Sequence, residues 1–98
     1  MPRIARGLVD GFVYHVLNRG NARQEIFHKD KDYEAFINLM KEAKARHRVK
    51  IFAYCLMPNH FHMVLMPDIG EELSKWMQWL MTSHIRRYHT HYGSSGHI

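Results

Sequence analysis

The sequence predicts a small α+β domain with the element order strand, helix, strand, strand, helix. Short runs rich in aromatic and β-branched residues alternate with two longer segments in which apolar residues recur every three or four positions. The chain has 98 residues, which is enough for one hydrophobic core. We therefore expect a single domain that spans residues 1–98.

The first strand is predicted over residues 12–18, Phe-Val-Tyr-His-Val-Leu-Asn. Side chains alternate between the two faces of a strand, which places Tyr14 and Val16 on one face and His15 on the other. The sequence Asn-Arg-Gly-Asn at 18–21 is a strong turn signal and should end the strand.

The first helix should begin at Asp30, the expected N-cap, with Asp32 and Glu34 favoured near its positive N-terminal end. Its buried face should repeat every three or four residues. The members of that face are Tyr33, Phe36, Ile37, Met40 and the aliphatic stem of Lys44.

The near-continuous apolar run at 51–57 predicts a central strand buried on both faces. Cys55 lies within this run and is expected to be a small buried side chain, and Tyr54 should belong to the core. Pro58-Asn59 predicts a tight turn into a second strand of a hairpin, which begins with the histidine-containing segment.

The second helix should follow Gly70-Glu71-Glu72 and end before the Gly-Ser-Ser-Gly sequence at 93–96. Its apolar stripe consists of Leu73, Trp76, Met77 and Leu80, with Trp79 widening it. This order matches a ferredoxin-like (RRM-like) βαββαβ sandwich that lacks its last strand, with two helices on one face of an antiparallel sheet. Such a fold makes the first and third strands neighbours.

The charge of the chain indicates a polyanionic partner. Lysine and arginine total 14 against 9 acidic residues, so the net charge is +5, and nine histidines add to it when protonated. Nucleic acid is the commonest partner of a small basic domain, and a merely basic surface is the alternative. No apolar run approaches the roughly 20 residues of a membrane helix, and the N-terminus lacks a signal-peptide core. One cysteine cannot form an internal disulfide, and we expect a cytoplasmic protein without a membrane partner.

The most informative segment is Met-Pro-Asn-His-Phe-His at 57–62. In a strand, His60 and His62 point to the same face, where their imidazoles can converge on one divalent metal ion. His15 could approach the pair from the neighbouring first strand. The alternative is a solvated strand face without a metal.

Four segments carry a resemblance to a known family: residues 14–21, Phe27 with Asp32-Tyr33, residues 54–62 and residues 83–97. Over nearly its whole length the chain resembles the HUH-class single-strand tyrosine transposases (the IS200-like transposases), and within them the REP-associated (RAYT) branch. The resemblance implies a DNA transposase that binds single-stranded or hairpin DNA, cuts and rejoins it, and acts as a homodimer.

The resemblance also implies a chemistry. His60 and His62 would bind Mg²⁺ or Mn²⁺, the metal would polarise the scissile phosphate, and a tyrosine would attack it to form a 5′-phosphotyrosine. The family's Tyr-Ile-x-x-Asn-Pro pattern is absent from this sequence. We therefore expect an N-terminal portion whose nucleophile, third metal ligand, final strand and C-terminal helix lie beyond Ile98. Tyr88 and Tyr92 are the remaining candidates within the chain.

Four arginines are the expected DNA contacts, because guanidinium groups pair well with phosphate. They are Arg19 and Arg23 in the first loop and Arg86 and Arg87 on the second helix. The histidines late in the chain, His84, His89, His91 and His97, are expected to be solvated or to face DNA. Two alternatives remain open: a module that binds nucleic acid without cutting it, and a small ferredoxin-like domain with a structural metal.

Overall fold

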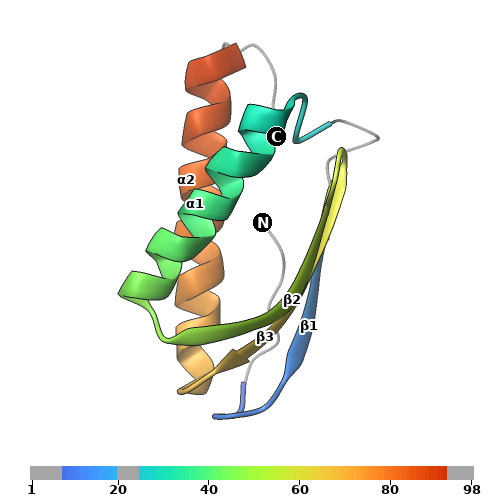
Figure 1. Cartoon of the computed structure of the whole chain (residues 1–98). Coiled ribbons are helices and arrows are strands. Elements are labelled where there is room, and N and C mark those ends of the chain that lie inside the picture. Colours follow the sequence, from blue (N-terminus) through green and yellow to red (C-terminus); the bar gives the residue numbers. More distant parts are fainter. Residues whose placement is uncertain (1–7, 20–24, 93–98) are drawn as a thin grey trace.

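The computed structural model describes residues 8–19 and 25–92. Its elements are β1 (Tyr14–Arg19), α1 (Asp30–Arg46), β2 (Val49–Met57), β3 (His60–Pro67) and α2 (Gly70–Tyr92). The predicted α+β class and element order are confirmed. Both helices lie on the same side of the three-stranded sheet (Figure 1). Neither of the two helices in the described ranges combines the length and apolarity needed to cross a bilayer.

The sheet is antiparallel with the order β1-β3-β2, so the histidine-containing strand is central. The prediction of a central strand at 51–57 is wrong: β2 lies at an edge, and Ala53, Tyr54 and Cys55 are exposed. A long apolar run does not distinguish a strand covered by two layers from an edge strand with one open face. The register of β2 on β3 shifts between Ile51 and Ala53, so the pairing of this edge strand is irregular there.

The core lies between the sheet and the two helices. On β3, Phe61, Met63 and Leu65 are completely buried and alternate with half-buried residues, which is the period of two expected for a strand with one covered face. The predicted stripe of α2 is confirmed, since all four of its members are buried: Leu73, Trp76, Met77 and Leu80. From α1 come Phe36, Met40 and Ala43, while Lys44 is exposed, contrary to expectation.

The start of α1 differs from the prediction in one respect. The N-cap residue is Lys29 and Asp30 is the first helical residue. Asp32 takes the capping role, because its carboxylate accepts the backbone N–H groups of His28 (2.7 Å) and Lys29 (3.2 Å). Backbone N–H groups at a helix start have no partner within the helix, and a carboxylate one turn along satisfies them.

The segment before β1 fixes the start of α2. The Gly70 N–H donates to Asp10 Oδ1 at 2.6 Å. The backbone of Leu8 lies so close to Gly70 that a Cβ there would overlap the Leu8 carbonyl oxygen. Glycine is therefore required at position 70 by this close approach.

Candidate metal and nucleic-acid site

The open face of the sheet carries a cluster of three histidines. His60 and His62 alternate with the buried residues of β3 and so point away from the helices. In the register of β1 on β3, Leu17 pairs with His62 and Val64 pairs with His15, so His15 lies on the same face one step along. The expected approach of His15 to the histidine pair is confirmed.

The imidazoles of this cluster are oriented by hydrogen bonds. His60 Nδ1 lies 2.8 Å from Asn59 Oδ1, and a carboxamide oxygen only accepts, so Nδ1 of His60 carries a hydrogen. In the neutral imidazole this leaves the lone pair on Nε2. His62 Nδ1 lies 3.2 Å from His15 Nε2, and these two rings are stacked with an interplanar angle of 8°. The ring centroids of His60 and His62 are 5.2 Å apart.

The two histidines of β3 have the donor chemistry that a divalent metal requires. Each offers one imidazole nitrogen on the same side of a rigid strand, and the hydrogen bond of His60 through its other nitrogen is a common feature of metal-binding histidines. Over residues 8–19 and 25–92, no group of three or more histidine, cysteine, aspartate or glutamate side chains is arranged to hold a metal.

The loop before α1 supports the turn that precedes the histidines. The Pro58 carbonyl accepts the backbone N–H groups of Ile26 (2.7 Å) and Phe27 (3.1 Å). Phe27 is buried between the helices, where its ring contacts Phe36 edge to face. The position of the β2–β3 turn, and with it the start of the histidine strand, is thus tied to the core.

Three of the four arginines that were expected to contact DNA lie within the described residues, and they occupy different environments. Arg19 is the last residue of β1, is exposed and pairs in register with His60, so it lies beside the histidine cluster. Arg23 lies outside the described residues. Arg86 is exposed on α2, whereas Arg87 is half-buried and its Nη1 donates to Asp32 Oδ1 at 2.9 Å.

The two candidate tyrosines near the end of α2 are engaged in hydrogen bonds. Tyr92 Oη donates to Asp32 Oδ2 at 2.5 Å, and Tyr88 Oη lies 2.6 Å from His28 Nε2. Burial, followed by this hydrogen bond to Asp32, raises the pKa of Tyr92 to about 12. A phenol with a raised pKa that donates to a carboxylate is poorly prepared to act as a nucleophile.

Asp32 is the centre of this network, a role that the sequence did not reveal. Burial by itself would raise the pKa of its carboxyl, but hydrogen bonds from Tyr92, His28, Arg87 and Lys29 together hold that pKa well below its usual range. The sequence signal was an aspartate at the third position of the helix, which the helix dipole alone also explains.

The late histidines do not share one environment. The prediction that His84 is solvated is wrong, since only 1% of its surface is exposed, and it packs against Phe27 and Phe36. Burial, with a smaller contribution from Arg87, lowers its pKa to about 4. An apolar stripe that includes position 84 at helical spacing from Leu80 was the missed signal. His91 is exposed as expected, His89 is half-buried, and His97 lies outside the described residues.

Comparison with known proteins identifies the family. The family model described as "Transposase IS200 like" matches residues 8–97, so the chain belongs to the IS200-like transposase family. Among solved structures, one similar fold is that of a REP-associated tyrosine transposase bound to a REP hairpin, with 17% identity and a TM-score of 0.70 over 89% of this chain. The chain spans 53% of the length of that protein.

A second similar fold belongs to a protein from Deinococcus radiodurans that is only provisionally described as a transposase. It is 17% identical, with a TM-score of 0.67, over 92% of this chain and 68% of that one. At this identity the two structures establish a shared fold. The search among curated proteins found no significant match.

Proposed function

We propose that this domain binds single-stranded or hairpin DNA and holds a divalent metal, Mg²⁺ or Mn²⁺, at His60 and His62 for tyrosine-mediated strand cleavage and rejoining. The observation that carries the proposal is the pair of imidazoles on one open face of the central strand, beside an exposed arginine, in a member of a transposase family. The solved relative in complex with a REP hairpin supports DNA of that shape as the substrate class.

His60 and His62 would hold the metal, and His15 would orient His62. A bound divalent ion supplies Lewis-acid stabilisation of negative charge on a phosphate. If His62 binds through Nε2, its Nδ1 carries the hydrogen and donates to His15 Nε2, which is the 3.2 Å contact that the structure contains. Arg19 would pair with a neighbouring phosphate, since its guanidinium is exposed at the same end of the open face.

Metal binding is tested directly with Mn²⁺, whose binding can be followed by electron paramagnetic resonance. The double variant His60→Ala/His62→Ala should lose binding, whereas His91→Ala, an exposed histidine of α2, should bind as the wild type does. His15→Ala should weaken Mn²⁺ binding by roughly 10- to 100-fold, the usual effect of removing a residue that orients a ligand. Equal Mn²⁺ affinity of the wild type and the double variant would show that His60 and His62 do not bind the metal.

DNA binding is tested with a fluorescent hairpin that carries a single-stranded flank. Affinity should fall steeply with salt, and Arg19→Gln should reduce the slope of log K against log salt by about 0.7–0.9, the contribution of one phosphate contact. Lys41→Gln, a charge-matched change on the exposed side of α1, is the control. A flat salt response would exclude binding through phosphate contacts.

We place the nucleophile at neither Tyr88 nor Tyr92, because their hydroxyl groups are committed to His28 and Asp32. This observation favours a second candidate function for the 98-residue chain, namely binding of DNA without cleavage. Incubation with a labelled hairpin and Mn²⁺ separates the two possibilities. A covalent protein–DNA adduct that persists in the double variant Tyr88→Phe/Tyr92→Phe would show that another tyrosine attacks.

Four further properties belong to the same proposal. The strand order β1-β3-β2 is that of a ferredoxin-like sheet whose fourth strand would pair with β1, which supports this fold and one domain for the chain. We also propose a cytoplasmic homodimer. Sedimentation at several concentrations tests the dimer.

A further inference from the structure

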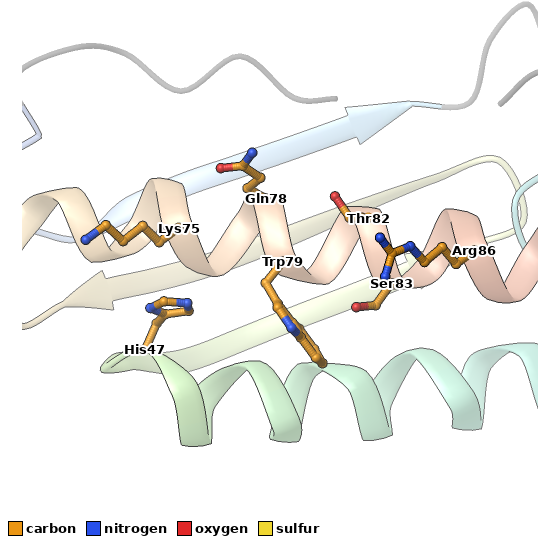
Figure 2. A pocket seen from close by; sticks show the side chains of 7 residues that line it. All are labelled: His47, Lys75, Gln78, Trp79, Thr82, Ser83 and Arg86. Carbon is orange, nitrogen blue, oxygen red and sulfur yellow. The ribbon is translucent and has the colours of Figure 1, made fainter.

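A groove runs along α2 on the helical layer of the molecule. It has a volume of about 370 Å³ and is lined by His47, Lys75, Gln78, Trp79, Thr82, Ser83 and Arg86. Six of these seven residues come from α2, and His47 follows the end of α1 (Figure 2). Its α2 residues recur every three or four positions, on the side opposite to the buried Met77 and Met81. Its volume lies within the range of about 300–1,000 Å³ that is typical of ligand sites.

The groove and the histidine cluster occupy opposite layers. His60 and His62 point away from the helices, whereas the groove is formed by the helices themselves. The groove therefore adds a surface that the proposed metal site does not use.

Most of the polar groups in the groove are available to a ligand. Within the described ranges, the side chains of Gln78, Thr82, Ser83 and Arg86 form none of the hydrogen bonds or ion pairs that the structure contains. His47 Nδ1 instead lies 3.1 Å from Glu72 Oε2, and Lys75 Nζ lies 3.6 Å from Glu71 Oε1. The acidic partners thus gather at one end of the groove, and the Arg86 end is positively charged.

Trp79 provides an aromatic surface between these ends. Its side chain extends from α2 toward α1 (Figure 2). The Arg46 guanidinium lies 4.7 Å from the centre of the Trp79 ring system, and Arg46 is not among the residues that line the groove. The contact holds the indole in place and brings a second cation near it, because a guanidinium is attracted to the face of an indole.

We propose that this groove binds a segment of single-stranded DNA, with a base against Trp79 and the adjoining phosphate at Arg86, Thr82 and Ser83. Alternation of an aromatic platform and a cation is how proteins hold single strands without reading their sequence. The net charge of +5 on the chain favours this polyanionic occupant. The inference rests on the proposed function, and it adds a second DNA contact on the face that does not carry the histidines.

The test uses the 98-residue chain and a short fluorescent oligothymidylate, which forms no hairpin. Arg86→Gln should reduce the slope of log K against log salt by about 0.7, the value for one phosphate of a single strand. Trp79→Leu should weaken binding roughly five- to hundredfold, and Trp79→Phe should retain most of the affinity, because a ring remains for stacking. Lys41→Gln is the charge-matched control and should leave the affinity close to that of the wild type, because Lys41 is an exposed cation of α1 outside the groove.

Tryptophan fluorescence gives an independent readout. The chain has two tryptophans, and Trp76 is completely buried, so quenching by acrylamide, a neutral quencher, reports on Trp79. Bound oligothymidylate should protect Trp79 from acrylamide in the wild type. Protection should also occur in His60→Ala/His62→Ala, since the histidine face is not required for it.

The outcomes distinguish this inference from the proposed function. If Arg86→Gln and Trp79→Leu bind like Lys41→Gln, or the wild type shows no protection of Trp79, the groove does not bind the strand. If His60→Ala/His62→Ala is the only variant that loses oligothymidylate binding, the result agrees with the proposed function and contradicts DNA binding by the groove. Urea unfolding checks that each variant is folded. If Trp79→Leu does not fold, Arg86→Gln decides the test, because Arg86 is exposed and its replacement should not disturb the core.

Discussion

Replacing Asp32 with asparagine should strongly destabilise the domain. Both carboxylate oxygens accept hydrogen bonds: Oδ1 from Arg87, and Oδ2 from Tyr92 and the backbone N–H groups of His28 and Lys29. An asparagine must turn its NH₂ group toward one of these two sets of donors, so at least one donor loses its acceptor in a site that is 1% exposed. Such a loss from a buried charged pair costs about 3–5 kcal/mol.

The assay is urea unfolding followed by far-ultraviolet circular dichroism, with Asp30→Asn as the matched control. Asp30 is exposed in the same first turn, and its replacement should cost only about 0.3–1 kcal/mol. For a domain of this size, Asp32→Asn should lower Tm by about 12 °C or more, since 1 kcal/mol corresponds to about 4–8 °C.

The pH dependence has a defined sign. The folded-state pKa of Asp32 is depressed, so its contribution to the free energy of unfolding is complete above the unfolded-state pKa of about 3.9. The contribution declines as the pH falls below that value toward the lower folded-state pKa. The reasoning is refuted if Asp32→Asn is as stable as Asp30→Asn, or if the wild type keeps its full advantage over Asp32→Asn at pH 2.

Three other changes have expected outcomes in the same unfolding assay. Gly70→Ala should displace the Leu8 backbone and lower the urea midpoint sharply, whereas Gly11→Ala has open space at Cβ and should cost about 1–2 kcal/mol for its φ of +72°. Burial lowers the pKa of His84 to about 4, below its unfolded-state value of about 6.5. The free energy of unfolding should therefore fall by about 3 kcal/mol as the pH drops from about 6.5 to about 4. His84→Leu should abolish this fall, and an unchanged pH profile in that variant would show that His84 does not cause it. Tyr92→Phe should cost about 1.5–3 kcal/mol, the value of one hydrogen bond to a charged acceptor, and a smaller loss would show that the bond to Asp32 contributes little.

The local patterns of the sequence predicted the parts of the structure that depend on near neighbours. Alternation along β3 placed Phe61 in the core and His60 and His62 on the opposite face. Helical spacing predicted the buried stripe of α2, and Pro58-Asn59 predicted the turn of the hairpin. These features depend on periods of two and 3.6 residues, which any window of the chain reveals.

Two errors came from the packing of layers, which no local window contains. Cys55 is exposed because β2 lies at an edge of the sheet, although its sequence is as apolar as that of a buried strand. His84 is buried because its position on α2 faces Phe27 and Phe36, which are 57 and 48 residues earlier in the chain.

For the candidate site, the sequence by itself determined that His60 and His62 share a face, because strand geometry leaves no other arrangement. The tertiary structure decided what surrounds them: His15 beside His62, and Arg19 opposite His60 in the register of β1 on β3. It also decided that Arg87 is paired with Asp32 while Arg86 lines a groove, although the two are adjacent in sequence. Adjacent helical residues point about 100° apart, and only the packing of α2 against α1 determines which of them meets a partner.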